Sequence, residues 1–256
     1  MEKLVLFITL IVFSFARAGL NDGLVAYYQL NNNAADSSGG SHPGTIYGNP
    51  DWSSQGHIDG SIDMDGDGDY VLIAGYPGIT GSGTRACSAW IRTSNVSSFN
   101  HAIVSWGNGS TTDQNWVMGL FTDGTIGVST YSRHIKGLTS IADGAWHHVA
   151  AVLPEGMTTV GQVQLYVDGV LLTQQQTFSN YPSHQINTSS GNVVIGGYNL
   201  DGVYRSFFDG NIDDVRIYDR TLSPDEVMQI YTIPEPCTLL LLGLGGLILR
   251  RRQRGL

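Results

Sequence analysis

The sequence predicts an all-β fold in which two antiparallel sheets pack face to face. Short runs of alternating apolar and polar residues recur along the chain, whereas the periodicity of an amphipathic helix is nearly absent. The composition agrees, because 33 glycines and only 14% charged residues are typical of many short strands joined by polar turns. Since no repeat or internal linker interrupts the pattern, we expect a single sandwich.

The strands are expected in a regular series from residue 24 to residue 218. Asp168-Gly169 favours a two-residue type I′ hairpin turn between two of them, and Asp123-Gly124 has the same composition. The predicted strands are 24–30, 44–47, 61–64, 70–73, 85–92, 101–106, 116–121, 125–130, 146–153, 162–167, 170–175, 193–197 and 210–218.

One short helix is predicted after the last strand, over residues 223–230. Ser223 is a suitable N-cap, Pro224 occupies the first helical position, and Glu226 at the third position completes a capping box. The helix therefore closes the fold near its C-terminal end.

The N-terminal residues 1–18 have the pattern of a signal peptide. Lys3 precedes the apolar stretch 4–15, and Ala16-Arg17-Ala18 supplies small residues before Gly19. We therefore predict that the chain is exported and that residues 19–232 form one domain.

The charge of this domain restricts its partners. Of the 22 acidic and 13 basic residues, two acidic and six basic ones lie in the terminal segments, so the domain carries 20 and 7 and a formal charge near −13. Such a surface repels nucleic acids and anionic lipid, and it favours calcium or uncharged ligands.

Several short phrases follow one another in an order that one protein family shares. They are Gly23-Leu24-Val25-Ala26-Tyr27-Tyr28, Ala35-Asp36-Ser37-Ser38-Gly39, Asp69-Tyr70-Val71, Ala89-Trp90-Ile91, Trp146-His147-His148-Val149-Ala150, Leu165-Tyr166-Val167-Asp168-Gly169 and Asp213-Asp214-Val215-Arg216-Ile217-Tyr218. Together they resemble the laminin-G-like jelly roll of the concanavalin A-like lectin and glucanase superfamily. The resemblance covers nearly all of residues 22–231 and implies a jelly-roll sandwich, a fold that carries lectins, enzymes, adhesion modules and spacers.

The C-terminal segment, residues 233–256, resembles the PEP-CTERM sorting signal of Gram-negative bacteria that make exopolysaccharide. Pro234, Glu235 and Pro236 precede an apolar stretch, expected to be helical, and Arg250, Arg251 and Arg252 follow it. The resemblance implies processing by an exosortase-type enzyme, transient membrane attachment, and a place at the cell surface or in the extracellular matrix. The alternative is an ordinary membrane anchor that is kept, with the arginines in the cytoplasm.

An enzymatic function is not expected. Glycoside hydrolases of this superfamily resemble one another in placing paired glutamates on one strand, and retaining chemistry needs two carboxyl groups about 5 Å apart. The four glutamates lie in the terminal segments, in a loop and on the predicted helix. Asp213 and Asp214 are adjacent on a predicted strand, so we expect their side chains to point to opposite faces. A hydrolase remains the less favoured alternative.

Two further groups of residues invite a metal interpretation that we do not favour. His147 and His148 are successive strand residues and cannot chelate one ion together, so we expect Trp146 in the core and one histidine bonded to a loop. The aspartates of residues 63–69 have the spacing of an EF-hand loop, but the twelfth position is Ala74. A strand, a tight turn and a second strand is the preferred interpretation.

A structural Ca²⁺ is predicted elsewhere. In the sandwiches that the chain resembles, such an ion lies where an N-terminal loop meets the last strand, and the matching residues here are Asp36 and Asp213. Asp213 is expected to share the core face with Val215 and Ile217, where a carboxylate needs a partner. Hydrogen bonds from loop backbone amides are the alternative to calcium.

The predicted ligand is a glycan or a surface protein. Sugars stack on exposed aromatic rings, and we expect Tyr204, Phe207 and Phe208 to form the best-exposed cluster, because consecutive aromatic residues in a loop cannot all point inward. Packing of this loop on the rim of the sandwich is the alternative, as is a structural or adhesive protein without a small ligand. The aromatic residues outside the clearest core motifs are Trp52, Trp106, Trp116, Tyr131, Tyr198, Tyr204, Phe207 and Phe208.

Overall fold

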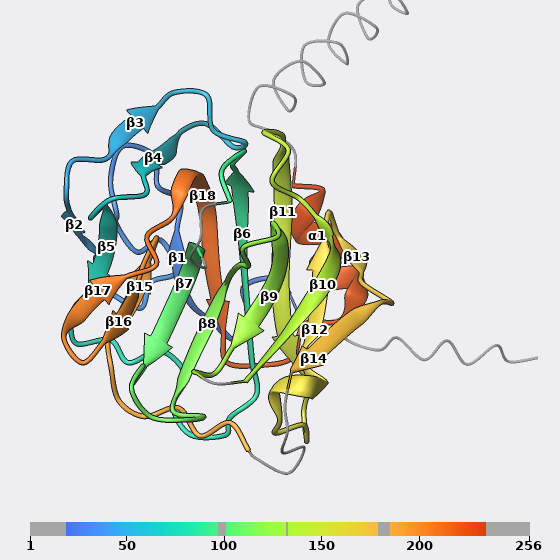
Figure 1. Cartoon of the computed structure of the whole chain (residues 1–256). Helices are drawn as coiled ribbons and strands as arrows, with labels where there is room; N and C mark the ends of the chain where they lie inside the picture. Colours follow the sequence, from blue (N-terminus) through green and yellow to red (C-terminus); the bar gives the residue numbers. More distant parts are fainter. Residues whose placement is uncertain (1–18, 97–100, 132, 179–184, 234–256) are drawn as a thin grey trace, which may run out of the picture.

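The computed structural model describes residues 19–96, 101–131, 133–178 and 185–233 and shows two antiparallel sheets of eight strands each (Figure 1). The prediction of an all-β, two-sheet sandwich is confirmed. In sheet A, β1 (Leu24–Tyr28) pairs with β18, and the order of the other strands is β13 (Val170–Leu171), β12 (Gln164–Val167), β11 (Trp146–Leu153), β6 (Arg85–Arg92), β18 (Asp209–Tyr218), β4 (Ser61–Asp65) and β3 (Asp51–Ser53).

Sheet B packs against one face of sheet A. A separate hairpin of β16 (Tyr198–Leu200) and β17 (Val203–Arg205) lies beside β7. The order of the strands in sheet B is β14 (Gln175–Phe178), β10 (His134–Ser140), β9 (Thr125–Ser129), β8 (Asn115–Leu120), β7 (His101–Gly107), β15 (Val193–Ile195), β5 (Tyr70–Ile73) and β2 (Thr45–Tyr47).

The core lies between the two sheets and is made by alternate residues of their strands. Trp116 of sheet B is fully buried and stacks on Trp106, with ring centroids 5.7 Å apart. Its indole N–H donates to the Sγ of Cys87 in sheet A at 3.4 Å. The inward residues of both sheets are mostly apolar, and the alternate residues lie on the two outer faces.

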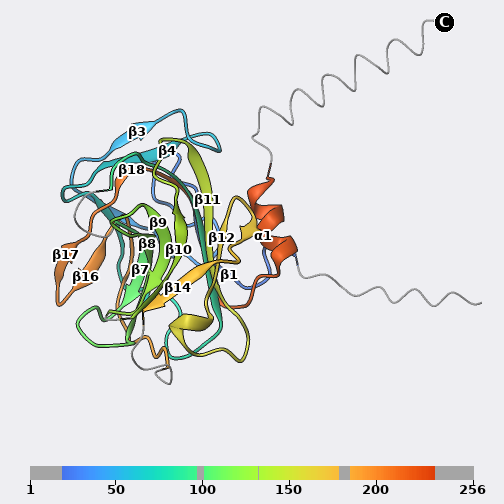
Figure 2. The same ribbon diagram turned by 45° about the vertical axis from the view of Figure 1, so that its right-hand side comes forward.

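The helix α1 (Pro224–Tyr231) covers part of the outer face of sheet A (Figure 2). The predicted capping box is present, because Ser223 accepts from the Glu226 amide and Glu226 accepts from the Ser223 amide. Val227 and Ile230 pack with Ala86 in a small second core. The outer face of sheet B lies on the far side of the sandwich from this helix.

A β-bulge in β18 overturns one prediction. The register with β6 shifts between Asp213 and Arg216, and Asp214 has a left-handed φ of +54°. Asp213 lies opposite Trp90, which is on the outer face of sheet A, and Asp214 accepts from Arg216 and from the Tyr27 hydroxyl on the same face. The extra residue of a bulge changes the alternation. The prediction that the two aspartates face opposite ways, with Asp213 on the core face, is therefore wrong.

Most predicted strands are present within a residue or two of their expected ends, and three have the predicted bounds: β5, β6 and β11. The aspartate-rich segment 63–69 joins β4 to β5 through a turn, as predicted. The Asp69 carboxylate accepts hydrogen bonds from the backbone amides of Asn49 at 2.7 Å and Asp65 at 3.3 Å. Five strands were not predicted: β3, β10, β14, β16 and β17. They are polar or interrupted by glycine, and their pairing partners rather than their own pattern make them strands.

The two terminal predictions lie outside the described residues. These are the signal peptide at 1–18 and the sorting segment with Pro234, Glu235, Pro236, Arg250, Arg251 and Arg252. Within the described part of the chain, no helix has the length and apolar character needed to cross a membrane.

Candidate functional site

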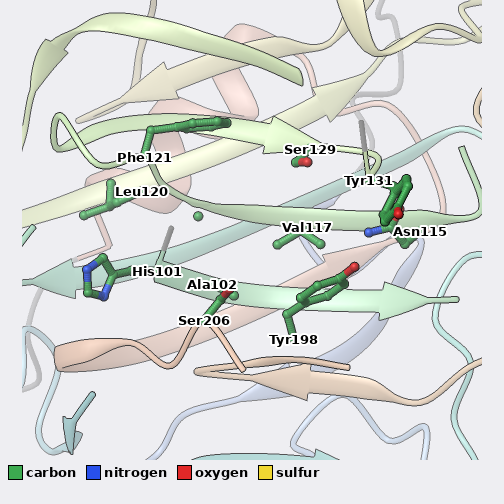
Figure 3. A pocket seen from close by; sticks show the side chains of 11 residues that line it. His101, Ala102, Asn115, Val117, Leu120, Phe121, Ser129, Tyr131, Tyr198 and Ser206 are labelled. Carbon is green, nitrogen blue, oxygen red and sulfur yellow. The ribbon is translucent and has the colours of Figure 1, made fainter. Parts of the chain in front are cut away.

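A pocket of about 120 Å³ opens on the outer face of sheet B, which we call the sheet B pocket (Figure 3). It extends along β7 and β8, and the β16–β17 hairpin closes one side. Figure 3 shows His101 and Phe121 towards one end and Asn115, Tyr131 and Tyr198 towards the other. The lining residues are His101, Ala102, Asn115, Val117, Gly119, Leu120, Phe121, Ser129, Tyr131, Tyr198 and Ser206.

The sheet is hollowed here because two neighbouring outward positions lack side chains. Gly119 of β8 pairs directly with Gly127 of β9. A Cβ added at Gly119 would lie 2.3 Å from the His101 carbonyl oxygen, and one at Gly127 would lie 2.5 Å from the Phe121 ring. The absence of a side chain at Gly127 therefore allows the Phe121 ring to pack directly against the backbone of β9. On the other side of β8, the residue of β7 that pairs with Gly119 is the small Ala102.

Asn115 is the polar residue at the base of the pocket. It begins β8, faces outward and is 1% exposed, and neither its amide nitrogen nor its amide oxygen has a hydrogen-bond partner in the described structure. A buried polar group without a partner costs about 1–3 kcal/mol. The site therefore favours a ligand, or water in its absence, that offers one acceptor and one donor side by side.

Tyr131 forms an exposed aromatic wall beside Asn115. It is 51% exposed and lies in the turn between β9 and β10 with a left-handed φ of +65°. The Thr130 amide donates to the Arg133 carbonyl at 2.8 Å, and Arg133 forms a buried ion pair with Asp113. Because Asp113 lies two residues before Asn115, this ion pair fixes the aromatic wall relative to the amide.

Tyr198, the first residue of β16, forms the wall of the sheet B pocket opposite Tyr131. Its hydroxyl donates to the Gly109 carbonyl oxygen at 2.5 Å, and burial raises the pKa of Tyr198 to about 12. The phenol therefore stays neutral at all physiological pH values, and its ring presents an apolar surface to the pocket.

His101 and Ser206 fix the connection that leads into β18. The His101 Nδ1 lies 3.1 Å from the Phe207 carbonyl oxygen, and the Ala102 amide donates to the Ser206 carbonyl at 2.9 Å. Ser206 has a left-handed φ of +56°. This conformation turns the chain from the hairpin back onto β7 and places Ser206 in the pocket.

None of the described residues that line the pocket is Asp, Glu, Lys or Arg. The lining has aromatic rings, small apolar groups, two serines, a histidine and an amide. Such a surface suits an uncharged ligand with hydroxyl groups and offers no pair of carboxyl groups for glycoside hydrolysis.

The aromatic residues predicted from the sequence lie beside this pocket. Tyr204 stacks on Tyr70 with ring centroids 4.3 Å apart, and Phe207 lies 6.0 Å from the same ring. Both are half-buried and do not line the pocket. Phe208 is fully buried in the core, so the prediction that it offers its ring to a ligand is wrong. The turn at Ser206 is the reason, because it directs the second phenylalanine inward.

The two carboxylates predicted to hold calcium have separate partners. Asp36 accepts from the amides of Tyr27, Ser38 and His42 at 2.9–3.1 Å. Burial alone raises its pKa, but these bonds and that of the Ser38 hydroxyl outweigh burial and lower the pKa. These contacts favour the alternative of backbone hydrogen bonds, and within the described ranges no three His, Cys, Asp or Glu side chains are placed to hold a metal ion. Calcium at Asp36 and Asp213 stays a prediction.

Asp213 is fully buried on the outer face of sheet A. One carboxylate oxygen accepts the Ile58 amide at 2.8 Å, and the other has no hydrogen-bond partner within the described ranges. Burial raises the pKa of Asp213 to about 8, against the lowering effect of the Ile58 amide. The group is therefore protonated at neutral pH.

The two histidines have different structural roles. The Nδ1 of His147 lies 2.9 Å from Asp168 in the β12–β13 turn, which confirms the predicted loop contact. His148 is buried beside Trp90. Trp146 is only half-buried, with the Arg92 guanidinium over its ring, so the prediction that it fills the core is wrong.

Sequence reasoning missed Asn115 as a site residue and grouped Tyr131 and Tyr198 among many aromatic residues. One signal was available. Gly119 and Gly127 occupy outward positions in two consecutive predicted strands, and paired glycines on the outer face of a sheet mark a hollow. The burial of Asn115 without a partner could not be predicted, because it depends on residues distant in the sequence.

Comparisons with known proteins agree with this fold. The structure of domain 4 of AbnA, a GH43 extracellular arabinanase from Geobacillus stearothermophilus, in complex with arabinotriose, has a TM-score of 0.59 and 21% identity. The match covers 82% of this chain and 98% of that one. The binding domain of Paraclostridial Mosquitocidal Protein 1 has a TM-score of 0.62 and 16% identity over 83% of this chain and 52% of that one. The chain thus spans about half the length of that toxin domain.

A comparison of the sequence with protein-family models identifies the family. The family model described as concanavalin A-like lectin/glucanases superfamily matches residues 65–228, which is more than half of the chain. This match includes the strands from β5 to β18, the sheet B pocket and most of α1. The chain therefore belongs to the concanavalin A-like lectin/glucanases superfamily, in its laminin G branch.

Proposed function

We propose that the protein is an exported, non-enzymatic surface or matrix protein that binds an uncharged glycan in the sheet B pocket. The buried amide of Asn115 is the observation that carries this proposal, because both of its polar atoms lack partners among the described residues and lie in a pocket that opens to solvent. Two neighbouring hydroxyl groups of a sugar supply one donor and one acceptor. The Tyr131 ring beside it offers apolar surface to the C–H groups of the sugar.

The comparisons support the class of ligand. The arabinanase domain that shares this fold was solved with arabinotriose, an uncharged sugar. At 21% identity the likeness extends to the fold alone. The negative charge of the domain and the uncharged pocket lining point in the same direction, since both disfavour an anionic sugar.

The test is binding of the purified chain to a panel of uncharged polysaccharides, measured by affinity electrophoresis and calorimetry. We expect saturable binding to at least one of them and at least tenfold weaker binding for Asn115→Leu, which removes both polar atoms and keeps the volume. Asn21→Leu is the matched control, because Asn21 is exposed in the turn before β1, on the side of sheet A.

Three outcomes would contradict the proposal. The pocket is not the site if Asn115→Leu binds as tightly as the unchanged protein. Turnover of any sugar in the panel would make the protein an enzyme. Saturable binding to a surface protein with no binding to any glycan would favour the adhesive alternative.

We propose that the ends of the chain direct it to the cell surface through an exosortase-type system. The apolar N-terminal stretch and the order of Pro234-Glu235-Pro236, apolar segment and Arg250-Arg251-Arg252 support this. In a host that has such an enzyme, we expect the intact mass of the protein to correspond to loss of residues 1–18 and of the C-terminal segment. Retention of that segment in the enzyme-containing host would favour an ordinary membrane anchor.

A further inference from the structure

A second hollow of about 220 Å³ lies at the end of β7 and β8, and we call it the loop hollow. Three connections line it: the β7–β8 loop, the segment before β15, and the turn of the β16–β17 hairpin. Their side chains are small or polar, among them Asn108, Ser190, Asn199 and Asp201. None of the residues that line the loop hollow also lines the sheet B pocket.

The two hollows share a wall. Tyr198 lines the sheet B pocket, and its hydroxyl donates to the carbonyl oxygen of Gly109, which lines the loop hollow. Asn115 in the pocket lies directly opposite Gly107 in the hollow. Adjacent residues of the same elements thus line both spaces.

Glycines form much of the loop hollow. A Cβ added at Gly109 would lie 2.3 Å from the Asn199 carbonyl oxygen, and one at Gly191 would lie 2.8 Å from the Gly107 carbonyl oxygen. Larger residues at these positions would force the loops apart. The floor is therefore peptide groups and short polar side chains, which suit hydroxyl-rich ligands rather than aromatic ones.

The volumes of the two hollows favour a ligand made of several sugar units. Pockets that enclose a small ligand usually measure roughly 300–1,000 Å³. The sheet B pocket, at about 120 Å³, is well below this range, and the two hollows together reach its lower end. The exposed Asp201 carboxylate in the loop hollow disfavours acidic sugars.

We propose that the two hollows are consecutive subsites of one cleft, and that the ligand is a chain of uncharged sugars rather than a monosaccharide. One unit contacts Asn115 and Tyr131, and the next unit passes Tyr198 into the loop hollow. This proposal rests on the proposed function of the sheet B pocket.

The test measures affinity against chain length by calorimetry. The probes are arabino-, xylo-, gluco- and manno-oligosaccharides of one to five units. For the series that binds, we expect the association constant to rise about tenfold or more from one unit to three. Ser190→Trp fills the loop hollow from an exposed position and should abolish this rise without changing the affinity for the single sugar. Ser54→Trp, an exposed position in the turn after β3, is the control for added bulk.

The outcomes separate this inference from the proposed function. Equal affinity for one and three units, still lost in Asn115→Leu, would overturn the chain-binding cleft and leave the glycan pocket intact. A rise with length that persists in Ser190→Trp would overturn the placement of the second subsite. Absence of binding by all four series would contradict the glycan function itself.

Discussion

Asn115 carries a buried primary amide whose two polar atoms have no partner in the described structure. The unfolded chain hydrates this amide fully, so folding leaves a cost at the site unless water in the pocket offsets it. Contacts with the proposed ligand would recover that cost, which makes the residue favourable for binding and unfavourable for stability.

Substitution of Asn115 by leucine should separate these two effects. We expect the free energy of unfolding to stay unchanged or rise by up to about 1 kcal/mol, because an apolar group of similar shape removes the unpartnered amide. Urea unfolding at equilibrium measures the change. Destabilisation by more than about 2 kcal/mol would show that the amide is bonded in the free protein, for example by ordered water.

Asp213 and His148 make opposite contributions to the pH dependence of stability. Burial raises the pKa of Asp213 to about 8, so the folded state holds a proton that the unfolded chain releases above about pH 4. Stability is therefore lost as the pH rises from about 4 to 8. Burial lowers the pKa of His148 to about 3. The free energy of unfolding that this group contributes therefore increases as the pH rises from about 3 to about 6.5. Only the Asp213 effect remains above that pH.

Substitution of Asp213 by asparagine should remove the loss of stability between about pH 6.5 and 8, which amounts to on the order of 2 kcal/mol. Urea unfolding at both pH values measures it, and Asp67→Asn, at an exposed position, is the control. An unchanged pH slope in Asp213→Asn would show that Asp213 is ionised in the folded state.

At the scale of elements, α1 stabilises the outer face of sheet A without contact to the glycan site. Its capping box joins Ser223 and Glu226, and Glu226 also forms an ion pair with Arg220 at 2.8 Å. Val227 and Ile230 are buried against the sheet. The helix is therefore expected to affect stability only.

Substitution of Ser223 by alanine should lower the free energy of unfolding by about 1 kcal/mol, because the Glu226 amide loses its acceptor. The thermal midpoint should fall while glycan affinity stays the same, because the sheet B pocket lies on the opposite side of the sandwich. A parallel loss of affinity would show that the two outer faces are coupled.

The whole molecule has two outer faces with different roles. The outer face of sheet A carries α1 (Figure 2), whereas the outer face of sheet B carries the sheet B pocket, with the loop hollow at the end of β7 and β8. The described part of the chain ends at Ile233, just after α1, on the side of sheet A.

Thermal unfolding of the whole domain with calcium and with EDTA tests the predicted ion. If calcium binds as predicted, the midpoint is higher with calcium than with EDTA and Asp36→Ala abolishes the difference. If the backbone amides that bond the Asp36 carboxylate suffice, the midpoint is the same in both conditions and Asp36→Ala lowers it equally in both.

Much of the fold could be predicted from local patterns. The bounds of β6 and β11 were predicted as they are, because long alternating or apolar runs specify a strand strongly. The strand β10, with Gly137 inside it, was missed, because only pairing with β9 and β14 makes that segment extended.

The sequence by itself determined the all-β class, the superfamily and the capped helix, because each depends on composition or on residues near one another in the chain. Only the tertiary structure decided where the proposed binding site lies. The bulge at Asp214 changed the facing of two carboxylates, the turn at Ser206 buried Phe208, and the pairing of Gly119 with Gly127 opened a hollow over Asn115. Each of these depends on which distant segments are brought into contact, and local patterns do not contain that information.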